Sequence, residues 1–125
     1  MKANKNLTTE EQKLLDFVFS QNIILKDVAY KQIHYSRIFR DKTPYYLILK
    51  FDVDKTKSAP FDTNPGHITS FNVIHDDGSA PSCFDFHFED NYVSILEIFN
   101  ADSSFMEYKK MCIGKIEPFK WPHQK

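Results

Sequence analysis

The segment from Phe84 to Phe99, FDFHFEDNYVSILEIF, constrains the fold of this chain more than any other stretch. Its first arm alternates phenylalanine with polar residues, a period of two that is typical of a β-strand with one buried face. The second arm, residues 92–99, is apolar except at Ser94 and Glu97, which predicts a strand covered on both faces and central in a sheet. Residues 89–91 are polar turn formers. The segment is therefore predicted to be a β-hairpin.

A helix is predicted ahead of the sheet. Thr8 and Glu11 have the spacing of a capping box, in which each residue satisfies a backbone N–H of the other. Apolar residues then recur at helical spacing as far as Val18, and the helix should end near residues 20–22. Its apolar stripe has to be buried, and the sheet is the only surface large enough to bury it.

Alternating apolar residues predict strands over 30–39, 45–53 and 68–74, with 23–28 as a connector or short strand. An Asp-Asp-Gly turn at 76–78 should end strand 68–74 and lead the chain into the strand at Phe84. Residues 54–66 contain two prolines and no regular pattern, and a loop of this length is usually functional or mobile.

After the hairpin, residues 105–111 are expected to form a short helix or an irregular arm. The tail carries Ile116, Phe119 and Trp121, so it should pack back onto the domain. With 125 residues the chain is one domain, 1–125. The predicted fold class is α+β, an N-terminal helix packed on an antiparallel sheet of about five strands in meander order.

Composition narrows the function classes. Lys and Arg total 16 against 17 Asp and Glu, so the basic excess of a nucleic-acid binder is missing. Three glycines exclude a Gly-rich phosphate loop. No apolar run approaches a membrane span, and the first six residues lack the apolar core of a signal peptide. Cys83 and Cys112 are not closely spaced, so we expect two free thiols in a cytoplasmic protein.

Candidate chemistry is sparse. His75 beside Asp76 and Asp77, with His87 on the next strand, could hold a metal, although histidines near polar turns are common without one. No local group would activate Cys112 as a nucleophile. We therefore expect no catalytic residues, no metal and no cofactor.

Acidic residues on and around the hairpin could instead receive a basic partner. Glu97 interrupts an apolar strand, so it should be paired, functional or on a partly covered face. A charged, solvent-facing layer is the ordinary explanation for such residues. The partner-binding candidates are Asp76, Asp77, Asp85, Glu89, Asp90 and Glu97, with Asp52 and Asp54 as a second cluster.

The helix LTTEEQKLLDFVF, the run of antiparallel strands and the ending YVSILEIFNADSS resemble small bacterial immunity proteins. These belong to contact-dependent growth inhibition and related polymorphic toxin systems, and Val93–Asp102 is the most specific piece. The resemblance implies a cytoplasmic antidote, monomeric when free and without catalysis, that blocks one cognate toxin domain, often a nuclease. The turn without glycine at 90–91 and the long loop at 54–66 depart from that pattern.

A small ligand-binding or enzymatic α+β cone, with a pocket between helix and sheet, is the alternative. A deep pocket converging on histidine or acidic side chains would favour it. A shallow acidic face would favour the inhibitor.

Overall fold

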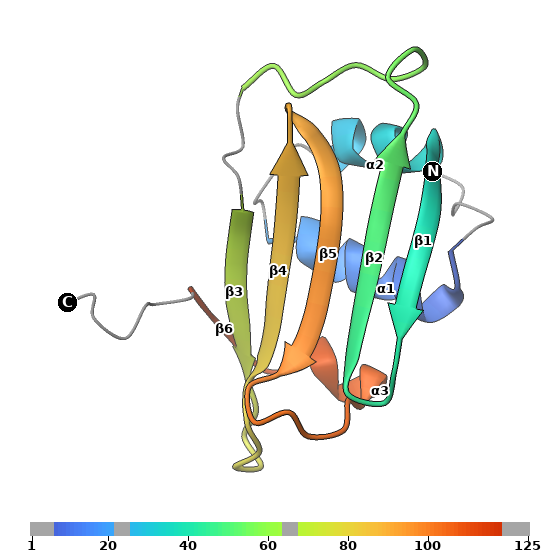
Figure 1. Cartoon of the computed structure of the whole chain (residues 1–125). Coiled ribbons are helices and arrows are strands. Elements are labelled where there is room, and N and C mark those ends of the chain that lie inside the picture. The colour runs from blue at the N-terminus through green and yellow to red at the C-terminus, as the bar shows by residue number, and fades with distance from the viewer. Residues whose placement is uncertain (1–6, 22–25, 64–67, 119–125) are drawn as a thin grey trace.

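The protein consists of a sheet with helices on one face (Figure 1). This computed structural model describes residues 7–21, 26–63 and 68–118. Within them the helices are α1 (Thr9–Phe19), α2 (Lys26–His34) and α3 (Tyr108–Met111). The strands are β1 (Ser36–Lys42), β2 (Tyr46–Val53), β3 (Ile68–Ile74), β4 (Ser82–Glu89), β5 (Tyr92–Asn100) and β6 (Lys115–Pro118). The α+β class and the antiparallel sheet are confirmed.

The predicted meander order is wrong. The described strands form a six-stranded antiparallel sheet in the order β1-β2-β5-β4-β3-β6. The chain leaves β2 and crosses the end of the sheet before it descends into β3 (Figure 1), so β5 returns to pair with β2. The predicted five-strand meander would have left the apolar β5 at an edge, and the observed order places it between β2 and β4 instead.

The hairpin is confirmed as β4 and β5. Phe84, Phe86 and Phe88 are all buried, and the turn residues Asp90 and Asn91 have φ values of 53° and 65°, as a tight hairpin turn requires. One part of the prediction fails, because the helices cover only one face of β5. On the other face its side chains are half-buried by neighbouring strands rather than by a second layer.

Helix α1 begins at the predicted cap. Glu11 N donates to Thr8 Oγ1 (3.1 Å) and Thr8 N donates to Glu11 Oε1 (2.9 Å), which completes the capping box. The helix ends at Phe19 with Ser20 as its C-cap. Leu14 and Leu15 are buried against the sheet phenylalanines in one hydrophobic core.

Helix α2 was missed by the sequence analysis, which predicted a connector and then a strand from residue 30. Ala29, Tyr30 and Ile33 are buried at helical spacing. Asp27 lies in the first turn and Lys31 in the last, each matching the helix dipole. Strand β1 begins only at Ser36. Tyr30 and Ile33, which the sequence analysis placed in a strand, therefore belong to the helix.

The described part of the long loop is anchored. Phe61 is 3% exposed and packs edge-on against Phe88, and its backbone N–H donates to Asn91 O (2.9 Å). The fully buried Gln32 of α2 donates to Ala59 O (2.9 Å) and accepts from Val93 N (2.9 Å). The described part of this loop, up to residue 63, therefore covers one end of the core.

The C-terminal segment packs back as predicted, through α3 and through β6, which pairs with β3. Gly114 has φ 142°, and a side chain there would collide with the carbonyl of Ile74. Phe119 and Trp121 lie outside the described residues. No helix in the described ranges is both long and apolar enough to cross a membrane.

Candidate functional site

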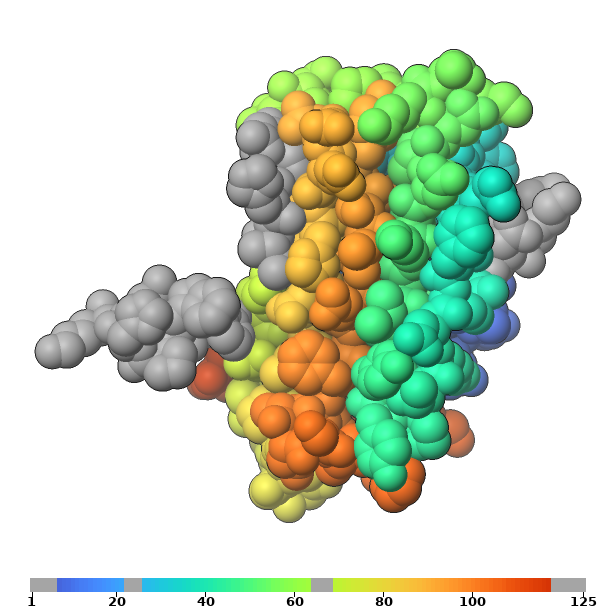
Figure 2. All heavy atoms as spheres, in the orientation of Figure 1, coloured from blue at the N-terminus to red at the C-terminus, as the bar shows by residue number. Residues whose placement is uncertain are grey.

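The sheet face turned away from the helices, here called the open face, is the candidate site. Figure 2 views it directly, and side chains of β1, β2, β4 and β5 lie uncovered across it. Strand alternation and register assign its members. Its acids are Asp41, Asp52, Asp85, Glu89, Glu97 and Glu117, and its cations in the described chain are Arg37, Lys50 and Lys115. The face is thus acidic on balance.

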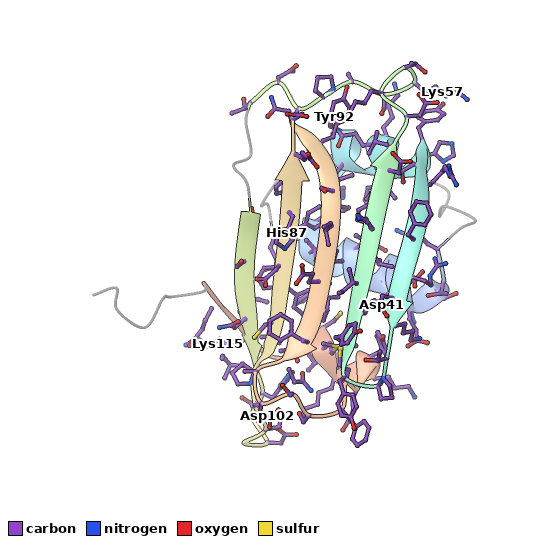
Figure 3. The ribbon with its side chains drawn as sticks, in the orientation of Figure 1. Asp41, Lys57, His87, Tyr92, Asp102 and Lys115 are labelled. Atoms are coloured by element: carbon purple, nitrogen blue, oxygen red, sulfur yellow. The ribbon has the colours of Figure 1, made fainter. Side chains whose placement is uncertain are left out.

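Two carboxylates meet at its centre. Asp85 of β4 lies directly opposite Glu97 of β5, and like charges in such a pair destabilise a sheet. His87 Nε2 lies 3.3 Å from Glu97 Oε1, without the geometry of a hydrogen bond. Figure 3 labels His87 on β4, in the half of the strand nearer Glu89. This imidazole offsets the repulsion only when it is protonated.

A third acid and an aromatic cavity extend the site toward β1 and β2. The Tyr46 hydroxyl donates to Asp41 Oδ2 (3.1 Å), and this hydrogen bond raises the pKa of Tyr46. Beside it is an open cavity of about 270 Å³ between β2 and β5. Its lining residues are Tyr45, Tyr46, Leu47, Ile48, Glu97, Ile98, Phe99 and Ser103.

The predicted acids do not form one cluster. Asp85 and Glu97 meet at the centre. Asp52, Asp54, Glu89 and Asp90 lie at the end of the sheet where β2 and β4 finish, and Asp76 and Asp77 lie in the turn at the opposite end. An eight-residue strand such as β4 separates the two ends by about 24 Å.

Two of these acids have local structural roles. Asp54 accepts from Thr56 N (3.0 Å) and Thr56 Oγ1 (2.6 Å), which lowers its pKa. Asp77 is an ion-pair partner of Lys110 and caps the turn at Ser79, so its pKa is also lowered. These contacts make both residues turn formers.

Sequence reasoning missed Asp41, Tyr46 and Phe99 as site residues. Tyr46 and Phe99 are cross-strand partners, and Ile48 is opposite Glu97, so the site depends on the β2–β5 pairing. That pairing follows from the strand order, which the sequence did not reveal. The available signal was the alternation of β2, which puts Tyr46 and Ile48 on the face away from the core.

The two histidines that the sequence analysis considered as metal ligands, His75 and His87, are far apart. His75 is buried at the end of β3, where its Nε2 is 2.9 Å from Ser82 Oγ and its Nδ1 is 3.1 Å from Ile113 O. His87 lies opposite Ile68, at the other end of β3. A cavity of about 260 Å³ adjoins His75 and Ser82, but Ser82 is 1% exposed and donates to Asn100 Oδ1. This network connects His75 to β5 and to the segment between α3 and β6.

A wider groove of about 540 Å³ lies between α1 and α3 on the helix side, lined by Glu10, Lys13, Leu14, Tyr108, Lys109 and Cys112. Burial raises the pKa of Tyr108 to about 12, with smaller contributions from Glu10 and Glu11. Both cysteines are free thiols, and burial raises the pKa of each, which disfavours the reactive thiolate.

Comparison with family models, with curated proteins and with solved structures gives no match for this chain. The functional argument therefore depends on the residues of the open face.

Proposed function

We propose that the protein is a binding protein of the immunity type, which neutralises a cognate bacterial toxin domain in the cytoplasm and has no catalysis of its own. The observation that carries the proposal is the open face itself. Within the described residues, one side of the sheet has no covering layer, and acids outnumber cations on it. A basic protein surface is complementary to such a face.

The central carboxylate pair supports a cationic partner. Asp85 and Glu97 repel each other in the free protein. A partner's lysine or arginine placed between them would relieve that repulsion as well as adding its own attraction. Toxins that cleave nucleic acids have electropositive clefts, because those clefts approach phosphates, so a nuclease domain is the partner class we propose.

Exposed aromatic groups supply a second requirement of a protein interface. Phe39 is 49% exposed on β1, and Tyr45 (48%) stacks on Phe105 (63%) at the edge of the face. Aromatic anchors of this kind dominate the binding energy of protein complexes, while charges set the association rate. Between α1 and the sheet, where the alternative ligand-binding function needs a pocket, the rings of Phe17 and Phe84 pack together with their centroids 5.6 Å apart.

Co-expression with the toxin domain encoded in the same operon tests the proposal. We expect a 1:1 complex that survives purification and protects the cell from the toxin. Hydrogen exchange should slow on open-face strands β2, β4 and β5 and stay unchanged in α1. Failure to form a complex, or protection confined to the helices, would contradict the proposal.

A further inference from the structure

We infer that the aromatic cavity between β2 and β5 is a binding site for a guanidinium group, filled by an arginine side chain of the partner. This inference extends the proposed function, because the arginine would come from the toxin. The cavity itself is a feature of the free protein and can be tested without any partner.

The lining of the cavity is suited to a cation. Tyr45, Tyr46 and Phe99 contribute aromatic rings, and Glu97 is the charged residue among the lining side chains of the described chain. Aromatic rings attract cations through their negative faces, and a carboxylate beside them adds a charge-assisted hydrogen bond.

The cross-strand register brings these groups together. Tyr46 lies opposite Phe99, and two residues further along β2, Ile48 lies opposite Glu97. The hydrogen bond from Tyr46 to Asp41 holds that tyrosine at its hydroxyl. The aromatic pair and the acid are thus neighbours on one face of two paired strands.

The size of the cavity favours a side chain over a larger ligand. Pockets that enclose drug-sized molecules measure roughly 300–1,000 Å³, and this open cavity measures about 270 Å³. A guanidinium is planar, weakly hydrated and able to stack on rings while it bonds a carboxylate with two N–H groups. An ammonium is more strongly hydrated, so lysine should bind less tightly.

Amide chemical shifts of the isotope-labelled protein, titrated with Nα-acetyl-arginine amide, test the inference directly. We expect weak, saturable shifts centred on residues 45–48 and 97–99. The citrulline analogue has nearly the same shape without the charge, and it should give no saturable shifts. Nα-acetyl-lysine amide should bind more weakly than the arginine compound. Equal binding of the arginine and citrulline compounds, or shifts centred elsewhere, would overturn the inference.

Two variants and a matched control separate the contributions. Glu97→Gln keeps the size of the side chain and should weaken arginine amide binding by about tenfold or more, because it removes a charge-assisted hydrogen bond. Phe99→Leu removes a ring and should weaken binding by about threefold or more. Asp27→Asn makes the same carboxylate-to-amide change at an exposed position in the first turn of α2, away from the residues that line the cavity, and should change binding by less than about threefold. A Glu97→Gln effect no larger than that of Asp27→Asn would reject the site.

The two proposals can fail separately. If arginine amide binds as expected but no toxin complex forms, the cavity is a guanidinium site and the proposed function is wrong. If the toxin complex forms and Glu97→Gln leaves both its affinity and arginine amide binding unchanged, the proposed function stands and the cavity is not the anchor.

Discussion

At the scale of single residues, Glu11 connects the first helix to the edge of the sheet. Its side chain is 3% exposed and forms an ion pair with Arg40 of β1, with Nε to Oε2 at 2.8 Å and Nη2 to Oε1 at 2.9 Å. Burial alone raises the pKa of Glu11, but the hydrogen bonds from Arg40 and from the Thr8 N–H outweigh it, so the pKa is lowered. One carboxylate thus serves both the helix cap and the helix–sheet contact.

Glu11→Gln is expected to lower the free energy of unfolding by about 1.5–3 kcal/mol at pH 7, because the amide loses charge-assisted hydrogen bonds from Arg40. A carboxyl whose pKa is lowered by folding stabilises the protein above its ordinary pKa of 4.5 and loses that contribution as pH falls through the folded value. Urea melts should therefore show a deficit that shrinks on acidification below pH 4.5. Glu10→Gln, an exposed neighbour, should cost less than about 1 kcal/mol. A deficit independent of pH would contradict this account.

Residue patterns predicted much of what depends on local sequence. The capping box, the buried faces of β2 and β4 and the tight turn at Asp90-Asn91 all follow from spacing and residue type. Glu97 was singled out from the sequence, because a charge in an apolar strand requires an explanation. Its neighbours in the site could not be predicted, since they come from a strand that is distant in sequence.

At the scale of elements, helix α2 supplies a hydrogen-bond acceptor for the backbone beside a β-bulge in β5. The register shifts between His87 and Phe88, so β5 carries an extra residue, Ser94, at a bulge. A bulge interrupts the ladder, and the N–H of Val93 is satisfied by Gln32 Oε1 of α2 instead. The same amide group donates to Ala59 O and, at 3.3 Å, to Asn91 O. One side chain therefore joins helix, loop and hairpin.

Gln32→Met keeps the length of the side chain and leaves the buried Val93 N–H without its acceptor. We expect a loss of about 1–3 kcal/mol in the free energy of unfolding and faster hydrogen exchange at Val93. Lys31→Met on the exposed side of the same helix should stay within about 0.5 kcal/mol of the unmodified protein. If the two variants have the same free energy of unfolding, the hydrogen bonds of Gln32 do not stabilise the protein.

The failure to predict α2 has a physical reason. Its stripe of Ala29, Tyr30, Gln32 and Ile33 includes a buried polar residue, so its hydrophobic signal is weak. Tyrosine and isoleucine also favour strands. The Gln32 amide can be buried because it forms hydrogen bonds with residues distant in sequence, and a single sequence does not reveal those partners.

At the scale of the whole molecule, the strand order decides where function can reside. The crossing from β2 to β3 puts the most apolar strand at the centre, and no described element forms a second layer on one face of the sheet. It also brings Asp85, Glu97 and the aromatic cavity together, whereas the acids of the turns are left at opposite ends. A meander with the same strands would have produced a different face.

The association rate of the toxin complex, measured by stopped-flow mixing, tests the central claim most directly. The double variant Asp85→Lys, Glu97→Lys should associate at least about tenfold more slowly at low salt and show a weaker salt dependence, because steering by the open face is lost. The control Asp27→Lys, Glu107→Lys makes the same change in net charge at exposed sites outside the open face and should associate within about threefold of the unmodified protein. Equal slowing by both variants, or slowing by the control alone, would contradict binding through the open face.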